Sequence, residues 1–250
     1  MPYVQVRGVT LYYEDRGQGQ PVLLIPGALG TGQSDFAPQL EDFPRHGLRV
    51  IALDPRGYGK SRPPERQFPL DFYEQDAQDC AALMAAIGCK QYAVCGWSDG
   101  AVIALMLTLH CPDQVGKLVV WGSNAYIAPE DIEGYEKTRS LASWSPRMVE
   151  TLRAIYGDAL QDLWARWCDA QLALYRAGGE LCRQRLHRIQ CPTLILHGGK
   201  DPLVPRFHAD ILHQGIAGSR LHIFSDGKHN IHLAYAEEFN RLVVGFLKES

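Results

Sequence analysis

The chain has 250 residues, of which 46% are hydrophobic and 21% are charged, and its formal net charge is −3. This length suits one large domain or two small ones, and the composition excludes a disordered or fibrous protein. No run of Lys and Arg is present, so we expect no nucleic-acid partner and no anionic membrane partner. The longest apolar stretch, roughly residues 101–109, is far shorter than the ~20 residues that span a membrane.

Cysteine usage and the first residues bear on the compartment. Seven cysteines form an odd number and no CxxC pair, which argues against a disulfide framework and a zinc ribbon. They are typical of a reducing compartment. The first five residues, MPYVQ, favour a strand over the basic segment of a signal peptide. We therefore expect a cytoplasmic protein; a form in the mitochondrial matrix, stripped of a leader, would look the same.

Short β runs alternate with helical patterns along most of the chain. Residues 4–7 and 10–14 flank Gly8 and predict an opening hairpin. Continuous apolar runs, typical of buried parallel strands, cover residues 21–25, 49–53, 92–95, 117–121, 193–196 and 221–224. Helical patterns cover residues 70–87, 99–110, 205–214 and 234–248. This order predicts an α/β fold with a doubly wound, mostly parallel sheet.

One long segment breaks the alternation. It has no strand signal and holds Trp144, Trp164 and Trp167. Apolar residues between positions 152 and 167 follow helical spacing with a break near Gly157. Taken singly, the residues of this stripe fit ordinary helix packing better than a binding role. The segment as a whole predicts a cap that shapes the leaving-group pocket. The predicted division is a helical cap of residues 125–189 inserted into a core of residues 1–124 and 190–250.

The candidate nucleophile is Ser98, in the run Gly96-Trp97-Ser98-Asp99-Gly100. A GxSxG pattern alone is weak, because it often arises by chance. Here it follows the expected strand 92–95 and opens the expected helix, which is the context of a nucleophile elbow. Small residues on both sides of the serine permit the tight turn that presents its hydroxyl above the sheet.

A serine nucleophile needs a base, and the base needs an acid that orients it. Asp201 follows the strand expected at 193–196, and His229 follows the strand expected at 221–224. Ligands and catalytic groups gather at the carboxyl ends of strands in open α/β sheets, so we predict a triad of Ser98, Asp201 and His229. The other candidates are weaker because they fall in helices, a strand or a turn: His208, His213, His232, His222 and Asp226.

Acyl transfer also needs donors aimed at the oxyanion. One is the N–H of Asp99, directly after the nucleophile at a helix N-terminus. The second should come from the glycine-rich turn after the strand at 21–25, where we favour the N–H of Ala28 and then that of Leu29. The alternative is that this turn has no catalytic duty.

These motifs resemble a known family. The elbow and the run DPRGYGKS at 54–61 are similar to the serine α/β-hydrolases in general. More specific runs are similar to the biphenyl hydrolase-like proteins, or valacyclovir hydrolases: GWSDG at 96–100, WGSNAY at 121–126, DPLVPRFHAD at 201–210 and GKHN at 227–230. The resemblance covers essentially the whole chain, and the ten-residue run from Asp201 is specific.

The resemblance implies hydrolysis of α-amino-acid esters, including amino-acyl nucleoside analogues. It also implies that Ser98, Asp201 and His229 form the triad and that Asp99 receives the α-amino group of the substrate. We further expect Trp97 and Leu203 to line the substrate pocket. From the residues alone, Asp99 has two readings. A carboxylate beside an oxyanion is unfavourable unless a substrate ammonium offsets it, but an acidic residue also suits the first turn of a helix.

The predicted reaction is acyl-enzyme catalysis on a small-molecule ester, with no metal or cofactor and with a monomeric protein. Two alternatives stay open. The same scaffold can act as a general carboxylesterase or thioesterase, or as a carbon–carbon or amide hydrolase, without preference for an amine. Some proteins of this fold are instead small-molecule receptors with slow or absent turnover. Ser98 in the elbow counts against dehalogenase and epoxide hydrolase chemistry, which normally uses an aspartate there.

Overall fold

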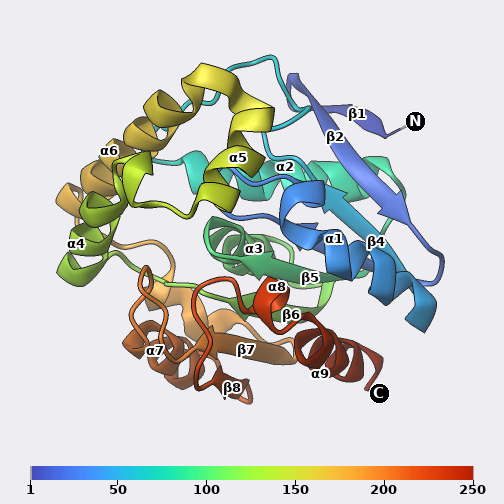
Figure 1. Cartoon of the computed structure of the whole chain (residues 1–250). Coiled ribbons are helices and arrows are strands. Elements are labelled where there is room, and N and C mark those ends of the chain that lie inside the picture. Colours follow the sequence, from blue (N-terminus) through green and yellow to red (C-terminus); the bar gives the residue numbers. More distant parts are fainter. Residues whose placement is uncertain (1, 250) are drawn as a thin grey trace.

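The apolar runs of the sequence form one eight-stranded sheet in the computed structural model, which describes residues 2–249 (Figure 1). The strand order is β1-β2-β4-β3-β5-β6-β7-β8. β1 and β2 pair antiparallel, as do β2 and β4, and the other pairs are parallel. The strands are β1 (Tyr3–Val6), β2 (Val9–Arg16), β3 (Gln20–Ile25), β4 (Leu48–Leu53), β5 (Tyr92–Trp97), β6 (Val115–Trp121), β7 (Thr193–Gly198) and β8 (Arg220–Phe224).

The predicted doubly wound, mostly parallel α/β fold is confirmed. Each expected strand is present with its ends shifted by at most two residues. The strand expected at residues 4–7 ends at Val6, because Arg7 and Gly8 turn the chain with positive φ angles of 46° and 78°. The central strands are completely buried over most of their length because helices cover both faces.

Helices α1 (Gly32–Asp42) and α9 (Ala236–Lys248) cover one face of the sheet. Helices α2 (Phe72–Ala86), α3 (Asp99–His110) and α7 (Phe207–Gly215) cover the other. Helix α1 is absent from the sequence predictions. It contains Pro38 and a kink at Phe36, and the capping box that starts it pairs Thr31 with Ser34 rather than with Glu or Gln.

Three helices between β6 and β7 lie beyond the carboxyl ends of the strands (Figure 1). They are α4 (Pro129–Thr138), α5 (Pro146–Tyr156) and α6 (Leu160–Arg176), and we call them the cap helices. The expected break near Gly157 is present, because a 3₁₀ turn at 157–159 separates α5 from α6. The sequence analysis did not resolve α4. A short helix, α8 (Ile231–Ala234), and 3₁₀ turns at 43–46, 141–143 and 183–188 complete the described elements.

The cap helices pack through their own aromatic cluster. Trp164 and Trp167 stack with ring centroids 4.5 Å apart, and Tyr135 meets Trp167 edge to face at 4.9 Å. Leu29 and Tyr58, from loops of the core, belong to the same buried cluster. This packing joins the cap to loops at the carboxyl end of the sheet through apolar burial.

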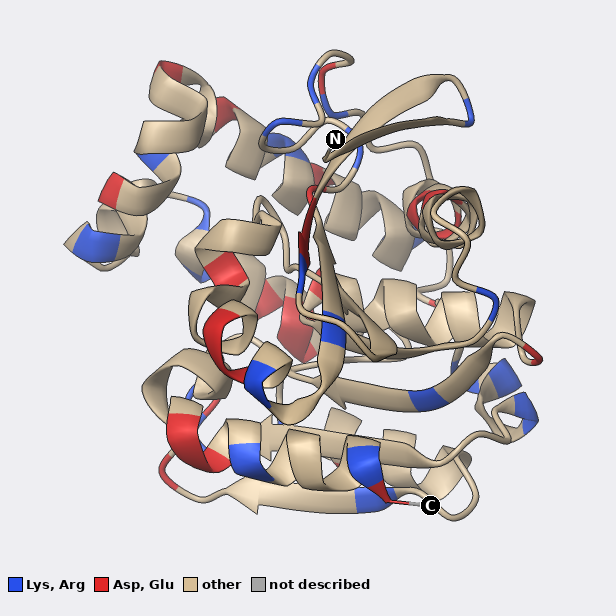
Figure 2. Cartoon of the chain, turned by 90° about the vertical axis from the view of Figure 1, so that its right-hand side faces the viewer, with Lys and Arg blue, Asp and Glu red and all other residues tan. Residues whose placement is uncertain are grey.

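Lys, Arg, Asp and Glu are scattered with both signs over the face shown in Figure 2. Within residues 2–249, none of the helices is long and apolar enough to cross a bilayer.

The close packing of α3 against β3 provides a stability test. A Cβ on Gly100 would lie 2.0 Å from the carbonyl oxygen of Ile25, and neither backbone can move freely. We expect Gly100→Ala to lower the free energy of unfolding by about 1–3 kcal/mol or more, measured by urea denaturation. The control is Gly116→Ala, where the nearest atom would be 3.9 Å away. Equal stability of the two variants would contradict this account.

Candidate active site

The turn between β5 and α3 presents Ser98 in a strained conformation. Ser98 has a φ of 55° and a ψ of −122°, which non-glycine residues rarely adopt. The turn requires glycine at both flanks. A Cβ on Gly96 would lie 2.2 Å from the carbonyl oxygen of Gly100, which itself contacts Ile25. The Ser98 N–H donates to the carbonyl of Trp121 at 3.0 Å, which fastens the turn to β6. These features are those of a nucleophile elbow.

Asp201 and His229 come together from the loops after β7 and β8. His229 Nδ1 lies 2.7 Å from Asp201 Oδ2. The backbone N–H groups of Leu203 and Val204 donate to Asp201 Oδ1 at 2.9 and 3.0 Å. Burial opposes the charge of Asp201, but interaction with His229 and these backbone donors hold the pKa of the carboxyl below its ordinary value. Asp201 is therefore an ionised acceptor that can orient the imidazole.

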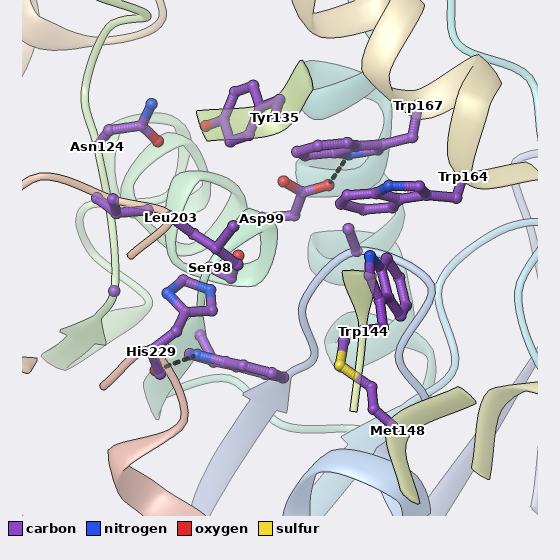
Figure 3. Close-up of a pocket in the computed structure, with 14 residues that line it drawn as sticks. Ser98, Asp99, Asn124, Tyr135, Trp144, Met148, Trp164, Trp167, Leu203 and His229 are labelled. Atoms are coloured by element: carbon purple, nitrogen blue, oxygen red, sulfur yellow. Dashed lines mark hydrogen bonds between the residues drawn. The ribbon is translucent and has the colours of Figure 1, made fainter. Parts of the chain in front are cut away.

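Ser98 and His229 line the same cavity (Figure 3). The His229 loop is held from below by Trp97, whose indole N–H donates to the His229 carbonyl at 3.0 Å. A Cβ on Gly122 would lie 3.0 Å from His229 Cε1, so a glycine at the end of β6 leaves space for the ring. The loops thus place a serine and an Asp-oriented histidine at one edge of the sheet.

The predicted oxyanion donors occupy suitable elements. Asp99 is the first residue of α3, where backbone N–H groups have no partner within the helix. Ala28 lines the cavity. Leu29, the second choice, is completely buried and has a φ of 62°. Its carbonyl accepts from the hydroxyl of Tyr156 in α5 at 2.8 Å, so a cap helix holds this loop.

A buried acid also holds the oxyanion loop. Asp35, at the start of α1, accepts from the N–H of Gly27 at 3.0 Å and from the hydroxyl of Ser34 at 2.7 Å. Burial raises the pKa of the Asp35 carboxyl to about 7. The loop at residues 27–30 is therefore anchored from the core side by Asp35.

The carboxylate of Asp99 is buried at the cavity wall. The residue is 7% exposed, and one of its oxygens accepts from the Tyr73 hydroxyl at 2.7 Å. The other accepts from the Trp167 indole N–H at 2.7 Å (Figure 3). Burial raises the pKa of the Asp99 carboxyl to about 6, although these two donors lower it. Asp99 is consequently ionised at neutral pH, and no cation of residues 2–249 forms an ion pair with it.

The cavity has about 550 Å³ of empty space and is partly open to solvent. Both residues that the sequence analysis assigned to the pocket, Trp97 and Leu203, line it. The remaining walls come from the core and from all three cap helices: Ala28, Ser98, Asp99, Gly122, Asn124, Tyr135, Trp144, Met148, Trp164, Trp167, Val204 and His229. Four of these are large aromatic side chains, and all four come from the cap segment between β6 and β7: Tyr135, Trp144, Trp164 and Trp167.

Other histidines have different roles. His232 is completely buried, its Nδ1 accepts from the indole of Trp121 at 3.0 Å, and burial lowers its pKa to about 3. His208 is bound to the carboxylate of Asp131 at 2.9 Å between α7 and α4. Asp226 is exposed and pairs with Lys200. None of these lines the cavity.

Sequence reasoning missed the cap side chains of the site and Tyr73. Trp164 and Trp167, which were assigned to ordinary helix packing, do pack together, but they also line the cavity, as does Trp144. A helical apolar stripe carries no signal that separates these two uses. Tyr73 lies 26 positions before Asp99 in the chain, and only the fold brings them together.

Comparison with known proteins places this geometry in a family. A model of the alpha/beta hydrolase family matches residues 22–242. The human protein named serine hydrolase BPHL is 48% identical to this chain over 98% of the chain and 85% of that protein. The mouse protein of the same name gives the same identity and coverage.

Solved structures share the fold. The enol-lactonase of Burkholderia xenovorans has a TM-score of 0.79 at 24% identity and covers 99% of this chain, with all of its own chain matched. An esterase of Exiguobacterium antarcticum has a TM-score of 0.74 at 27% identity, with 99% of each chain covered. At this identity the enol-lactonase supports the architecture alone.

The site predicts the consequence of removing the hydroxyl of Ser98. We expect Ser98→Ala to lower kcat for ester hydrolysis by ~10⁴–10⁶-fold, because oxyanion binding and substrate binding alone retain little rate. The folded state should survive, since the elbow is held by hydrogen bonds of the Ser98 backbone, which the substitution keeps. Turnover within ten-fold of wild type would exclude Ser98 as the nucleophile.

The buried charge of Asp99 predicts a gain in stability when it is removed. Because the pKa is raised to about 6 in the folded protein, burying the ionised carboxyl lowers stability as pH rises from about 4 through 6. We expect Asp99→Asn to raise the free energy of unfolding at pH 7.5 by up to about 3 kcal/mol. The gain should shrink toward zero at pH 4. Denaturant unfolding at both pH values measures it, and a gain of equal size at both would contradict the charge argument.

Proposed function

Because this chain belongs to the alpha/beta hydrolase family and is a serine hydrolase, we propose that it cleaves esters of α-amino acids, with Asp99 binding the substrate ammonium. One observation carries the proposal. Next to the candidate nucleophile lies a buried carboxylate that faces the substrate cavity. Its oxygens accept from Tyr73 and Trp167, and among residues 2–249 no Lys, Arg or His forms an ion pair with it, since nearby Arg66 is paired with Asp76. A cationic group on the substrate is the partner that this site lacks.

The proposed reaction proceeds through an acyl-enzyme. The Ser98 hydroxyl attacks the ester carbonyl as His229, oriented by Asp201, accepts its proton. The tetrahedral oxyanion is bound by the N–H groups of Asp99 and Ala28. His229 then gives the proton to the leaving alcohol, and the acyl group stays on Ser98. Water, activated by His229, releases the amino acid and restores the serine.

Electrostatics give this site a reason to select amines. An uncompensated carboxylate close to a developing oxyanion raises the energy of the transition state by an amount on the order of 1–4 kcal/mol. A substrate ammonium between the two negative groups removes that cost and gains attraction of its own. A neutral ester gains nothing from Asp99. The same residue therefore favours amino esters and disfavours esters that lack the amine.

The walls of the cavity fit an apolar substrate body. Trp97 lines the cavity beside Ser98. Leu203 from the core and Trp144 and Met148 from the cap face the same space (Figure 3). Aromatic and thioether side chains supply broad apolar contact and adapt to differing shapes. We expect this part of the cavity to receive apolar portions of the acyl side chain or the leaving group.

A general carboxylesterase or a carbon–carbon hydrolase is the second candidate. It is favoured by relatives such as the 2-hydroxy-6-oxo-6-phenylhexa-2,4-dienoate hydrolase of Comamonas testosteroni, which is 28% identical over 96% of this chain. A neutral substrate of such an enzyme would gain nothing from the buried charge of Asp99. An amino-acid ester would pair its ammonium with that charge.

The decisive experiment compares two esters in wild type and Asp99→Asn. The substrates are the benzyl esters of phenylalanine and N-acetyl-phenylalanine, which differ in the charge of the amine. Losing one partner of a desolvated charge pair typically costs 2–5 kcal/mol, so kcat/KM for the free amine should fall roughly 30-fold or more. The rate on the N-acetyl ester should hold or rise. Equal slowing of both esters would show that Asp99 only supports the elbow.

A further inference from the structure

Asp99 is held by donors from both the core and the cap. The Tyr73 hydroxyl, on α2 of the core, donates to Asp99 Oδ1 at 2.7 Å. The Trp167 indole N–H, on α6 of the cap, donates to Asp99 Oδ2 at 2.7 Å (Figure 3). One turn further along α6, the Gln171 amide donates to the Tyr73 oxygen at 2.9 Å. All four side chains are at least nine-tenths buried.

The direction of these hydrogen bonds favours the ionised form of Asp99. The Trp167 indole can only donate, and Gln171 uses the acceptor capacity of Tyr73 so that the phenolic O–H is free to donate to the carboxylate. Donors to a buried carboxylate stabilise its negative charge and fix its plane. The network therefore supplies both the charge and the orientation that an ammonium would meet.

The surrounding charges do not replace these donors. Arg66, in the loop before α2, lowers the pKa of Asp99, but it is paired with Asp76 at 2.6 Å, and Asp76 raises that pKa. The other titratable groups nearby are Tyr135 of α4, Tyr58 of the loop after β4, and His229 at the opposite wall of the cavity. Tyr73 and Trp167 are the groups that contact the carboxylate directly.

We propose that Tyr73 and Trp167 are positioning residues that determine amine specificity by keeping the Asp99 carboxylate charged and oriented toward the cavity, with Gln171 setting the direction of the Tyr73 hydroxyl. This proposal rests on the proposed function of Asp99. It gives the cap a part in amine specificity, because Trp167 and Gln171 both lie on α6.

The hydrogen bonds to Asp99 matter because its carboxyl must titrate well below the α-amino group of the substrate. An ammonium pair requires that Asp99 be ionised while the α-amine is still protonated. An α-amino group titrates near ~7.7–8.0, and the pKa of Asp99 is about 6, which leaves a window around neutral pH. Removing one donor raises the pKa of Asp99 toward that of the amine. The window then narrows, and amine preference declines at neutral pH.

Indole signals of the full chain labelled with ¹⁵N-tryptophan report this titration without catalysis. The chain has five tryptophans, and Trp167→Phe identifies the signal of Trp167. In wild type this signal should shift with a midpoint near pH 6, and the shift should vanish in Asp99→Asn. A hydrogen bond to a charged group is worth enough to move a pKa by ~1–2 units, so Tyr73→Phe should raise the midpoint to about 7–8. Gln171→Leu should raise it by less.

Trp164→Phe is the matched control. Trp164 stacks on Trp167 and lines the same cavity, but it makes no hydrogen bond to Asp99. Its variant should leave the midpoint within about 0.3 pH units of wild type. An unchanged midpoint in Tyr73→Phe, or an equal change in Trp164→Phe, would overturn the network as the source of the charge.

Kinetics connect the network to specificity. The measured quantity is the ratio of kcat/KM for the phenylalanine ester to kcat/KM for the N-acetyl-phenylalanine ester between pH 5 and 9. Titrations that affect both substrates equally, such as that of the catalytic base, do not change this ratio. In Tyr73→Phe the acid limb of this ratio should move up with the NMR midpoint, and the ratio at pH 7 should fall roughly two- to ten-fold. A uniform fall at every pH would indicate a merely structural role. If Asp99→Asn keeps the full amine preference, the proposed function fails, whereas the NMR midpoints still decide the network.

Discussion

The buried negative charge of Asp99 is the constraint around which this site is arranged. Its position is fixed by the elbow, because it directly follows Ser98 and begins α3. Burial makes the charge unfavourable in the empty protein, as its raised pKa records. The folded protein therefore retains a charge that lowers its stability, and under the proposed function the substrate ammonium would offset this cost. Such a cost at a functional site is expected where binding, rather than stability, determines the residue.

The cap contacts two parts of the candidate site. Its helix α6 contributes Trp167 to the carboxylate of Asp99, and its helix α5 contributes Tyr156 to the carbonyl of Leu29 in the oxyanion loop. Tyr156 also accepts from the N–H of Gly59. The cap thus contacts the charge site and the oxyanion loop through separate hydrogen bonds. Movement of these helices would therefore change the surroundings of both Asp99 and the loop at residues 27–30.

The sequence predicted the fold and the arrangement of loops because those features follow from local patterns. Apolar runs identify buried strands, and Ser98, Asp201 and His229 each follow one of them. Helix α1 was missed because Pro38 and a kink obscure its pattern. The donors to Asp99 were missed for a different reason. Trp167 is 68 positions from Asp99, and its spacing on α6 is that of any buried helical stripe.

The loops at the sheet edge could be predicted and the donors to Asp99 could not, because the two depend on different parts of the fold. The carboxyl ends of parallel strands lie at one edge of the sheet, so any chain with this sheet can bring three loops together there. Two proteins that share the fold at 24% identity are named as an enol-lactonase and a meta-cleavage product hydrolase, so the fold alone does not determine the substrate. Under the proposed function, charge selection also needs donors that the cap places against Asp99 in the elbow. Substitutions in α6 would then alter which esters are accepted without changing Ser98, Asp201 or His229. The proposal thus separates specificity, which it assigns to the contact between cap and elbow, from reactivity, which it assigns to those three residues.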